Sequence, residues 1–155
     1  MERDTAGDLR FLSPSRKDLV TLLPTDGDTL RSMMPYEGLQ AWQCCHALFL
    51  EIYRVTGRFP KSEFYGLTTQ MRRAAFSAAA NLAEGSAKRG AREFRRYIDI
   101  TLGSLSELSY AIRAVWDLGL GTADDVRRLD ELRQQAGRLT WGLYRRVCAK
   151  AGEGL

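Results

Sequence analysis

The stretch FRRYIDITLGSLSELSYAIRAVW, residues 94–116, decides the fold class of this chain. Its mostly apolar side chains recur every three or four residues, which is the spacing of one face of an α-helix: Phe94, Tyr97 or Ile98, Thr101, Leu105, Leu108, Ile112, Val115 and Trp116. Gly90 and Glu93 mark its start as an incomplete capping box, because glycine has no side-chain oxygen. The pattern predicts a long amphipathic helix that ends before Gly119.

Three further helices follow from the same spacing. The first begins near Leu39 and ends at Thr56 and Gly57, the second runs from about Leu67 to Gly85, and the last follows Thr122 as N-cap. The apolar stripe of the first helix comprises Leu39, Trp42, His46, Phe49 and Tyr53, widened by Cys45, Leu48 and Ile52. Four helices with short connections and no strand signal predict an all-α, antiparallel up-down-up-down four-helix bundle.

The chain is long enough for one domain with a real core. We assign residues 35–150 to the bundle, residues 1–34 to an N-terminal tail that is mostly irregular or mobile, and residues 151–155 to a C-terminal tail. Pro14, Pro24 and the Asp26-Gly27 pair give the first segment its tail composition. No apolar run approaches the roughly 20 residues that span a bilayer, and the N-terminus lacks a signal-peptide pattern. We expect a soluble, cytoplasmic protein without a membrane partner.

The second predicted helix carries a polar row where a core-facing helix would place leucines. The row repeats at three-and-four spacing and comprises Gln70, Arg73, Ser77, Asn81 and Glu84. Ser104 and Glu107 on the third helix are candidate partners, because an unsatisfied polar group in a packed interface costs about 1–3 kcal/mol. Two other interpretations stay open: the row faces water, or it lies in a contact between subunits.

Enzymatic chemistry has little support in the sequence. The only histidine, His46, lies on an apolar stripe, where a histidine is more often a packed residue than a ligand or base. Glu84 and Glu107 form at most a carboxylate pair without an acid partner, and no helix carries the Glu-x-x-His pattern of di-metal bundles. Three cysteines without CxxC spacing predict reduced thiols. We therefore expect no catalytic residue, no metal and no cofactor.

The basic residues point to a different class of function. Residues 35–155 hold 18 basic and 13 acidic side chains, and the segment between Gly85 and Tyr97 has a single acid, Glu93. A positive patch beside a helix start attracts phosphates, and the candidate nucleic-acid-binding residues are Arg72, Lys88, Arg89, Arg92, Arg95 and Arg96. The alternative is a solvated basic face that only keeps the protein soluble.

Several motifs, in order and at matching separations over residues 36–147, resemble one known family. They are Trp42-Gln43 with His46, Ile52-Tyr53-x-x-Thr56-x-x-Phe59-Pro60, Tyr65-Gly66-Leu67-x-x-Gln70-x-Arg72-Arg73-Ala74-Ala75, Asn81-x-Ala83-Glu84-Gly85, Glu93-Phe94 and Gly103-Ser104-x-x-Glu107-Leu108. The chain is similar to the bacterial four-helix-bundle family that is named for proteins encoded in ribosomal RNA intervening sequences. That family includes the accessory variability determinant (Avd) of diversity-generating retroelements.

The resemblance implies a subunit that assembles into a ring, typically a homopentamer, whose basic surface binds nucleic acid and which has no established catalytic activity. In retroelements the ring associates with a reverse transcriptase and template RNA. The shared polar positions correspond to Gln70, Arg73, Asn81, Glu84, Ser104 and Glu107, which favours a buried or interfacial polar row. Two departures stand out: Ala78-Ala79 replaces a frequent Ile-Pro, and Gly90 replaces a frequent serine.

These observations lead to two functional hypotheses. The first is a non-enzymatic, ring-forming module that binds RNA or DNA, with a reverse transcriptase as a further expected partner. The second is a structural or protein-interaction scaffold that touches no nucleic acid. They differ in whether the arginines converge on an open face or are engaged by Glu93, Asp99, Asp124 and Asp125.

Overall fold

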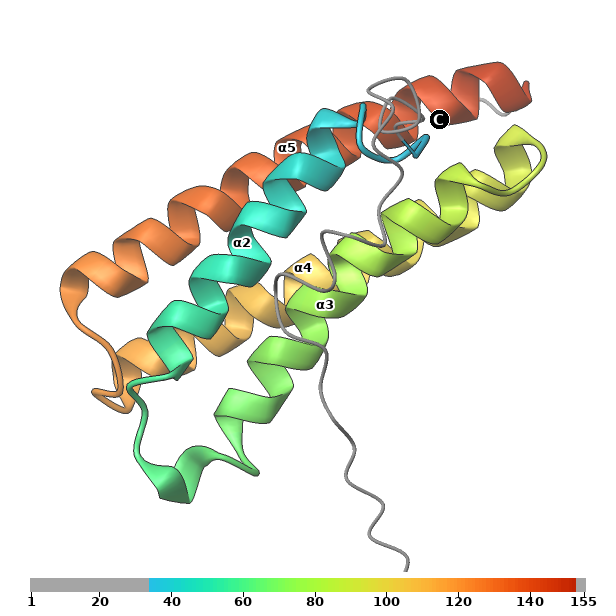
Figure 1. Cartoon of the computed structure of the whole chain (residues 1–155). Coiled ribbons are helices and arrows are strands. Elements are labelled where there is room, and N and C mark those ends of the chain that lie inside the picture. Colours follow the sequence, from blue (N-terminus) through green and yellow to red (C-terminus); the bar gives the residue numbers. More distant parts are fainter. Residues whose placement is uncertain (1–33, 153–155) are drawn as a thin grey trace, which may run out of the picture. The chain divides into compact units, whose positions relative to one another are not determined.

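The computed structural model of the chain describes residues 34–152 (Figure 1). This part of the chain contains no β-strand. Its elements, in chain order, are the helix α2 (Gln40–Thr56), the short 3-10 helix η2 (Lys61–Glu63), and the helices α3 (Leu67–Ser86), α4 (Ala91–Asp117) and α5 (Ala123–Ala151). The tail predicted for residues 1–34 lies outside the described residues, except for Met34.

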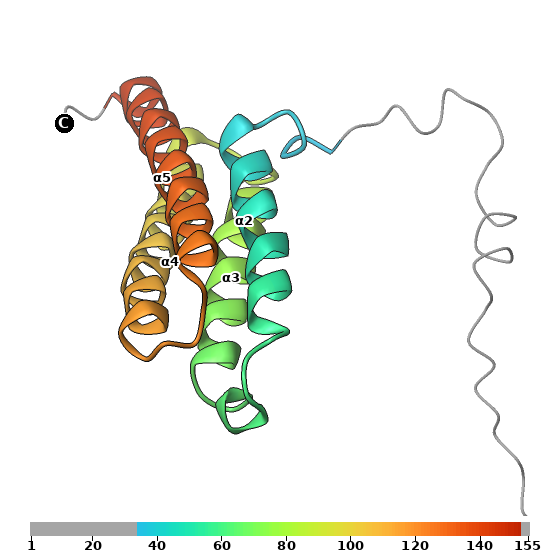
Figure 2. The same ribbon diagram turned by 90° about the vertical axis from the view of Figure 1, so that its left-hand side faces the viewer.

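The four helices alternate in direction, so the predicted antiparallel four-helix bundle is confirmed (Figures 1 and 2). Each helix packs against two others, and α2 and α5 close the bundle. The connection from α3 to α4 and the last turns of α5 lie at the same end, where α2 also begins. We call this the basic end. No helix in residues 34–152 is long and apolar enough to cross a membrane.

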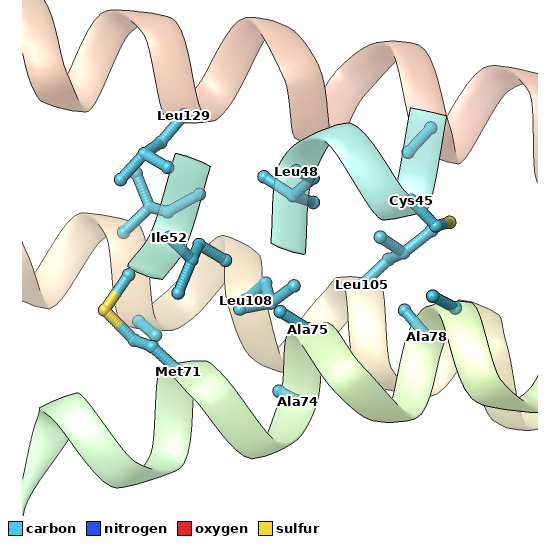
Figure 3. Close-up of a cluster of buried hydrophobic side chains, with 14 of the residues drawn as sticks. Cys45, Leu48, Ile52, Met71, Ala74, Ala75, Ala78, Leu105, Leu108 and Leu129 are labelled. Carbon is cyan, nitrogen blue, oxygen red and sulfur yellow. The ribbon is translucent and has the colours of Figure 1, made fainter. Parts of the chain in front are cut away.

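Leucine, isoleucine, methionine and alanine side chains from all four helices fill the core (Figure 3). Along α2 the fully buried residues are Cys45, Leu48 and Ile52. The row predicted as the centre of the α2 stripe is instead its edge: Trp42 and His46 are half-buried, and Tyr53 is 45% exposed. The predicted and observed core faces of α2 differ because a spacing pattern does not distinguish a large aromatic ring from a smaller aliphatic group. Only the smaller groups fit between α3 and α5.

The edge row forms an aromatic face on the surface of α2. The Trp42 and His46 rings are stacked with centroids 5.0 Å apart. The centroid of the Phe49 ring lies 6.1 Å from that of His46 and 6.2 Å from that of Phe76 of α3. Phe76 is 63% exposed. With Tyr36, these residues line a shallow groove of about 250 Å³. We define the aromatic face as Tyr36, Trp42, His46, Phe49 and Phe76.

Helices α3 and α4 approach closely because α3 presents alanines and a glycine to its neighbour. The Thr101 hydroxyl donates a hydrogen bond to the Ala78 carbonyl across the interface at 3.2 Å. At Gly85, a Cβ atom would lie 2.6 Å from the Tyr97 Cβ and 2.8 Å from the Phe94 Cδ2. α3 contains no proline and runs as one helix over 20 residues.

An ion-pair network joins α2 to α5 at the end opposite the basic end. We define it as Glu51, Arg54, Arg58, Asp125 and Arg128. Asp125 Oδ1 accepts from Arg54 at 3.0 Å and from Arg58 at 2.6 Å, and Arg128 Nε lies 2.9 Å from Glu51 Oε1. Asp125 also completes a capping box with Thr122, whose role as N-cap was predicted. The start of α5 is therefore fixed both by its cap and by α2.

The three cysteines are free thiols. Cys45 and Cys148 are buried, and burial raises the pKa of the Cys45 thiol to about 12. A thiol with such a pKa is almost entirely protonated at neutral pH and is a poor nucleophile or metal ligand. These side chains act as small apolar groups in the core.

Candidate nucleic-acid interface

Five of the six predicted nucleic-acid-binding side chains lie together at the basic end. They follow one another through the turn after α3 and the first two turns of α4: Lys88, Arg89, Arg92, Arg95 and Arg96. Arg89, Arg92 and Arg96 are exposed, and Arg95 is half-buried. We call these five residues the basic patch.

The local sequence explains why this turn is so compact. Gly85 permits the close contact of α3 with Phe94 and Tyr97, so α4 starts directly beside the end of α3. Gly90 adopts φ = 93°, a left-handed conformation that residues with a Cβ rarely occupy. It is also the N-cap of α4 and offers no side-chain cap, as its sequence predicted. The chain thus reverses within a few residues and places basic side chains on both sides of the reversal.

Lys88 of the basic patch has a defined acidic partner. Its Nζ lies 3.1 Å from Glu84 Oε1 and 5.4 Å from the centre of the Tyr97 ring. The Tyr97 hydroxyl donates to the same carboxylate oxygen at 2.7 Å, and this bond, followed by Lys88, lowers the pKa of Glu84. Glu84 therefore orients Lys88 and offsets part of its charge, and Glu93 is exposed beside the arginines.

Arg72 is not part of the basic patch. It lies near the other end of α3, roughly 20 Å along the helix axis from Ser86 at 1.5 Å per residue. Its Nε donates to the Thr56 hydroxyl at 2.9 Å, and its guanidinium stacks 4.4 Å from the centre of the Tyr53 ring. These contacts tie α3 to α2. The structure therefore gives Arg72 a packing role and separates it from the five residues with which it was predicted to act.

Sequence reasoning missed a contribution from α5. Because α5 runs antiparallel to α4, its last turns return to the basic end and bring Arg145, Arg146 and Lys150 there. Arg145 is exposed, and the other two line a cleft together with Lys88. The signal was present in the sequence as the Arg145-Arg146 pair and Lys150, at the end of a helix that the predicted topology already placed beside the turn.

This cleft, which we call the end cleft, has a volume of about 710 Å³. It exists because α2, at 17 residues, spans roughly 26 Å, whereas α5, at 29 residues, spans roughly 44 Å and extends beyond it. Its lining combines the three cations with an apolar wall and contains no acidic residue: Gly38, Leu39, Gln40, Lys88, Gly90, Ala91, Phe94, Leu143, Arg146, Val147 and Lys150.

The polar row of α3 lies along the groove between α3 and α4. The residues at the centre of the row form hydrogen bonds. The hydroxyls of Ser77 and buried Ser104 are 2.9 Å apart, and the Asn81 amide donates to the Ser77 carbonyl at 2.8 Å. The connection between the helices thus runs through the two serines, and Asn81 bonds within its own helix.

The ends of the polar row are open. Gln70, Arg73 and Glu107 are exposed around a groove of about 260 Å³, and no ion pair joins Arg73 to Glu107. Glu84 is exposed and belongs to the contacts of Lys88. Within one chain the centre of the row is half-buried against α4 and its ends are exposed, so a subunit contact at its ends stays a prediction.

Fold and site together define an antiparallel four-helix bundle with a basic end built from the α3–α4 turn and the last turns of α5. The family model of the 23S rRNA-intervening sequence protein matches residues 37–142. The chain belongs to this family, which confirms the resemblance identified from its motifs. A comparison with curated protein sequences gives no match.

Proposed function

We propose that the protein is a non-enzymatic RNA-binding module that assembles into a ring and presents its basic end to the nucleic acid. The observation that carries this proposal is the convergence of basic side chains from two separate segments on one end of the bundle. Cations of the basic patch and of α5 gather there around a cleft lined by no acidic residue. The family description adds an RNA association.

Charge density is the physical reason for this assignment. Nucleic acid releases counterions when several phosphates are neutralised together, and the affinity then falls steeply with salt. One basic end supplies a few such contacts. A ring of identical subunits would repeat them around its axis and give the continuous positive surface that a polynucleotide needs.

Ring assembly is part of the proposal and has its own support. Contiguous exposed apolar surface on a subunit marks an interaction site. The aromatic face provides such a surface, and Tyr110 and Trp116 of α4 are 77% and 52% exposed. An aromatic face on α2 that packs against a different surface of the next copy gives a head-to-tail contact, the kind that closes into a ring. We further propose, from the resemblance alone, a homopentamer that acts with a reverse transcriptase.

The decisive experiment measures RNA binding across a salt series for the full chain. Replacing Arg89, Arg92 and Arg96 with glutamine should abolish binding of a labelled single-stranded RNA without changing helix content, because all three are exposed. The matched control replaces Lys61, Arg113 and Arg127, which are exposed at the opposite end, and should bind as the unaltered protein does. Equal losses in both variants would contradict an interface at the basic end.

The second candidate function is a protein-interaction scaffold without nucleic-acid binding. The aromatic face favours it, because exposed rings suit contacts between proteins. The same salt series separates the two functions. An assembly that binds neither single-stranded RNA nor duplex DNA at low salt would support the scaffold and overturn the RNA-binding proposal.

A further inference from the structure

The end cleft has the features of a small-molecule site and not only of a charged surface. Its volume of about 710 Å³ lies within the usual range of ligand sites, about 300–1,000 Å³. One wall is apolar and includes the Phe94 ring and the side chains of Leu143 and Val147. Sites of this kind bind the apolar body of a ligand on the wall and orient it with a few polar groups.

The polar groups of the end cleft are all suited to an anion. Lys88, Arg146 and Lys150 line it, and the structure assigns no ion pair to Arg146 or Lys150 within residues 34–152. A guanidinium binds phosphate through two parallel hydrogen bonds, and an ammonium group binds it as a point charge. A ligand with a flat apolar part and a phosphate therefore complements both halves of the cleft.

We propose that the end cleft binds one unpaired nucleotide, with its base against Phe94, Leu143 and Val147 and its phosphate among Lys88, Arg146 and Lys150. This inference rests on the proposed function, because it assigns part of the RNA interface. Lys88 belongs to both the basic patch and the cleft, so a strand held by the patch passes the cleft mouth. The protein thereby binds single strands in preference to duplexes, whose paired bases are not free to enter.

The same chemistry is present in a free nucleotide and in an RNA strand, and the test includes both. Methyl groups of Leu143 and Val147, observed by NMR in the full chain, report on a base through its ring current. AMP should shift them in a saturable manner, inorganic phosphate should not reproduce the shift, and single-stranded RNA should move the same signals. A blunt RNA duplex of equal length should leave them unchanged.

Two neighbouring arginines provide a matched pair of variants. Arg146 lines the cleft, and Arg145 is exposed on the same turn but does not line it. Arg146→Glu should weaken AMP binding about tenfold or more, the effect of losing one charge-assisted hydrogen bond. Arg145→Glu, which makes the same change of charge at the same end of α5, should leave AMP affinity within about twofold.

The outcomes separate this inference from the proposed function. If single-stranded RNA binds but the methyl signals stay fixed, the cleft assignment is wrong and the RNA-binding function stands. If AMP shifts the signals but no RNA binds, the cleft is a site for free nucleotides and the RNA-binding function is wrong. Equal losses of AMP affinity in the two glutamate variants would overturn the cleft assignment, because the effect would then be one of net charge.

Discussion

Asp125 is the side chain with the most partners at the end of the bundle opposite the basic end. It caps α5 together with Thr122 and accepts hydrogen bonds from Arg54 and Arg58. The Thr122 hydroxyl, followed by the two arginines, holds the pKa of the Asp125 carboxyl well below its usual range. Arg54 likewise lowers the pKa of Glu51. The buried carboxylates of the ion-pair network therefore remain charged under ordinary conditions.

These two carboxylates make the stability of the fold depend on pH. In the folded state the pKa of Asp125 lies below its reference value of 3.8, and that of Glu51 lies below 4.5. Their contribution to the free energy of unfolding is therefore fully present above about pH 4.5 and is lost as the pH falls further. Asp125→Asn should lower the free energy of unfolding near neutral pH by about 1–3 kcal/mol, because the arginines lose their charged partner. The variant should also lose less stability than the unaltered protein on acidification, as measured by urea unfolding at several pH values.

Asp124→Asn is the control for this prediction. Asp124 is adjacent in sequence, but its side chain is 87% exposed, and its ion pair is with Arg127 of the same helix. Its replacement should change the free energy of unfolding by no more than about 0.5 kcal/mol. If the Asp125 variant and the unaltered protein lose the same unfolding free energy on acidification, other carboxylates cause the pH dependence.

The contact between α3 and α4 depends on the absence of a side chain at Gly85. Alanine favours a helix interior by about 1 kcal/mol over glycine. At Gly85, however, the added methyl would meet the Tyr97 Cβ, which moves only with the backbone. Gly85→Ala should therefore destabilise the protein by about 1–3 kcal/mol in thermal or urea unfolding.

Gly137→Ala tests the opposite case within a helix of the same bundle. Gly137 lies inside α5, and a Cβ atom there would meet nothing within 4 Å. This variant should be as stable as the unaltered protein or more stable by up to about 1 kcal/mol. Destabilisation of the same size in both variants would show that the close approach at Gly85 is not the cause.

The long helices were predictable because their signals agree at several levels. α5 has a capping box at Thr122, acids in its first turn and an apolar stripe, and α4, a helix of 27 residues, keeps its stripe from Phe94 to Val115. The face of α2 was harder to predict, because spacing alone does not distinguish Trp42 from Leu48 as a core residue. Packing decides, and packing depends on neighbours that are distant in sequence.

The site was predictable only in part, for a related reason. The basic patch is contiguous in sequence, whereas Arg146 and Lys150 join it only through the antiparallel path of α5. Arg72 was assigned to the patch on charge alone, although its place early in α3 already put it far from the turn. Its hydrogen bond to Thr56 and its stacking on Tyr53 are tertiary contacts that no local pattern contains.

At the scale of the whole molecule, the aromatic face predicts that several copies of the chain assemble. Phe76 is exposed in the subunit and lies beside Phe49, so a contact between copies would bury it. Phe76→Glu should reduce the mass measured by light scattering to that of one chain, because an unpaired carboxylate in an apolar interface is strongly disfavoured. Helix content, measured by circular dichroism, should stay the same.

Leu118→Glu is the matched control for assembly. Leu118 is 64% exposed, which is similar to Phe76, but it lies in the turn after α4 and away from the aromatic face. This variant should keep the mass of the unaltered protein. A Phe76 variant that also keeps this mass would remove the aromatic face from the subunit interface.

The two ends of the bundle are built differently. The ion-pair network and the capping box of α5 fix one end, whereas α2 and α4 begin at the basic end without a side-chain cap. Substitutions of exposed side chains at the basic end, such as Arg89 and Arg96, therefore disturb few contacts on which folding depends. The exposed surface of the basic end could therefore change what it recognises while the opposite end preserves the architecture.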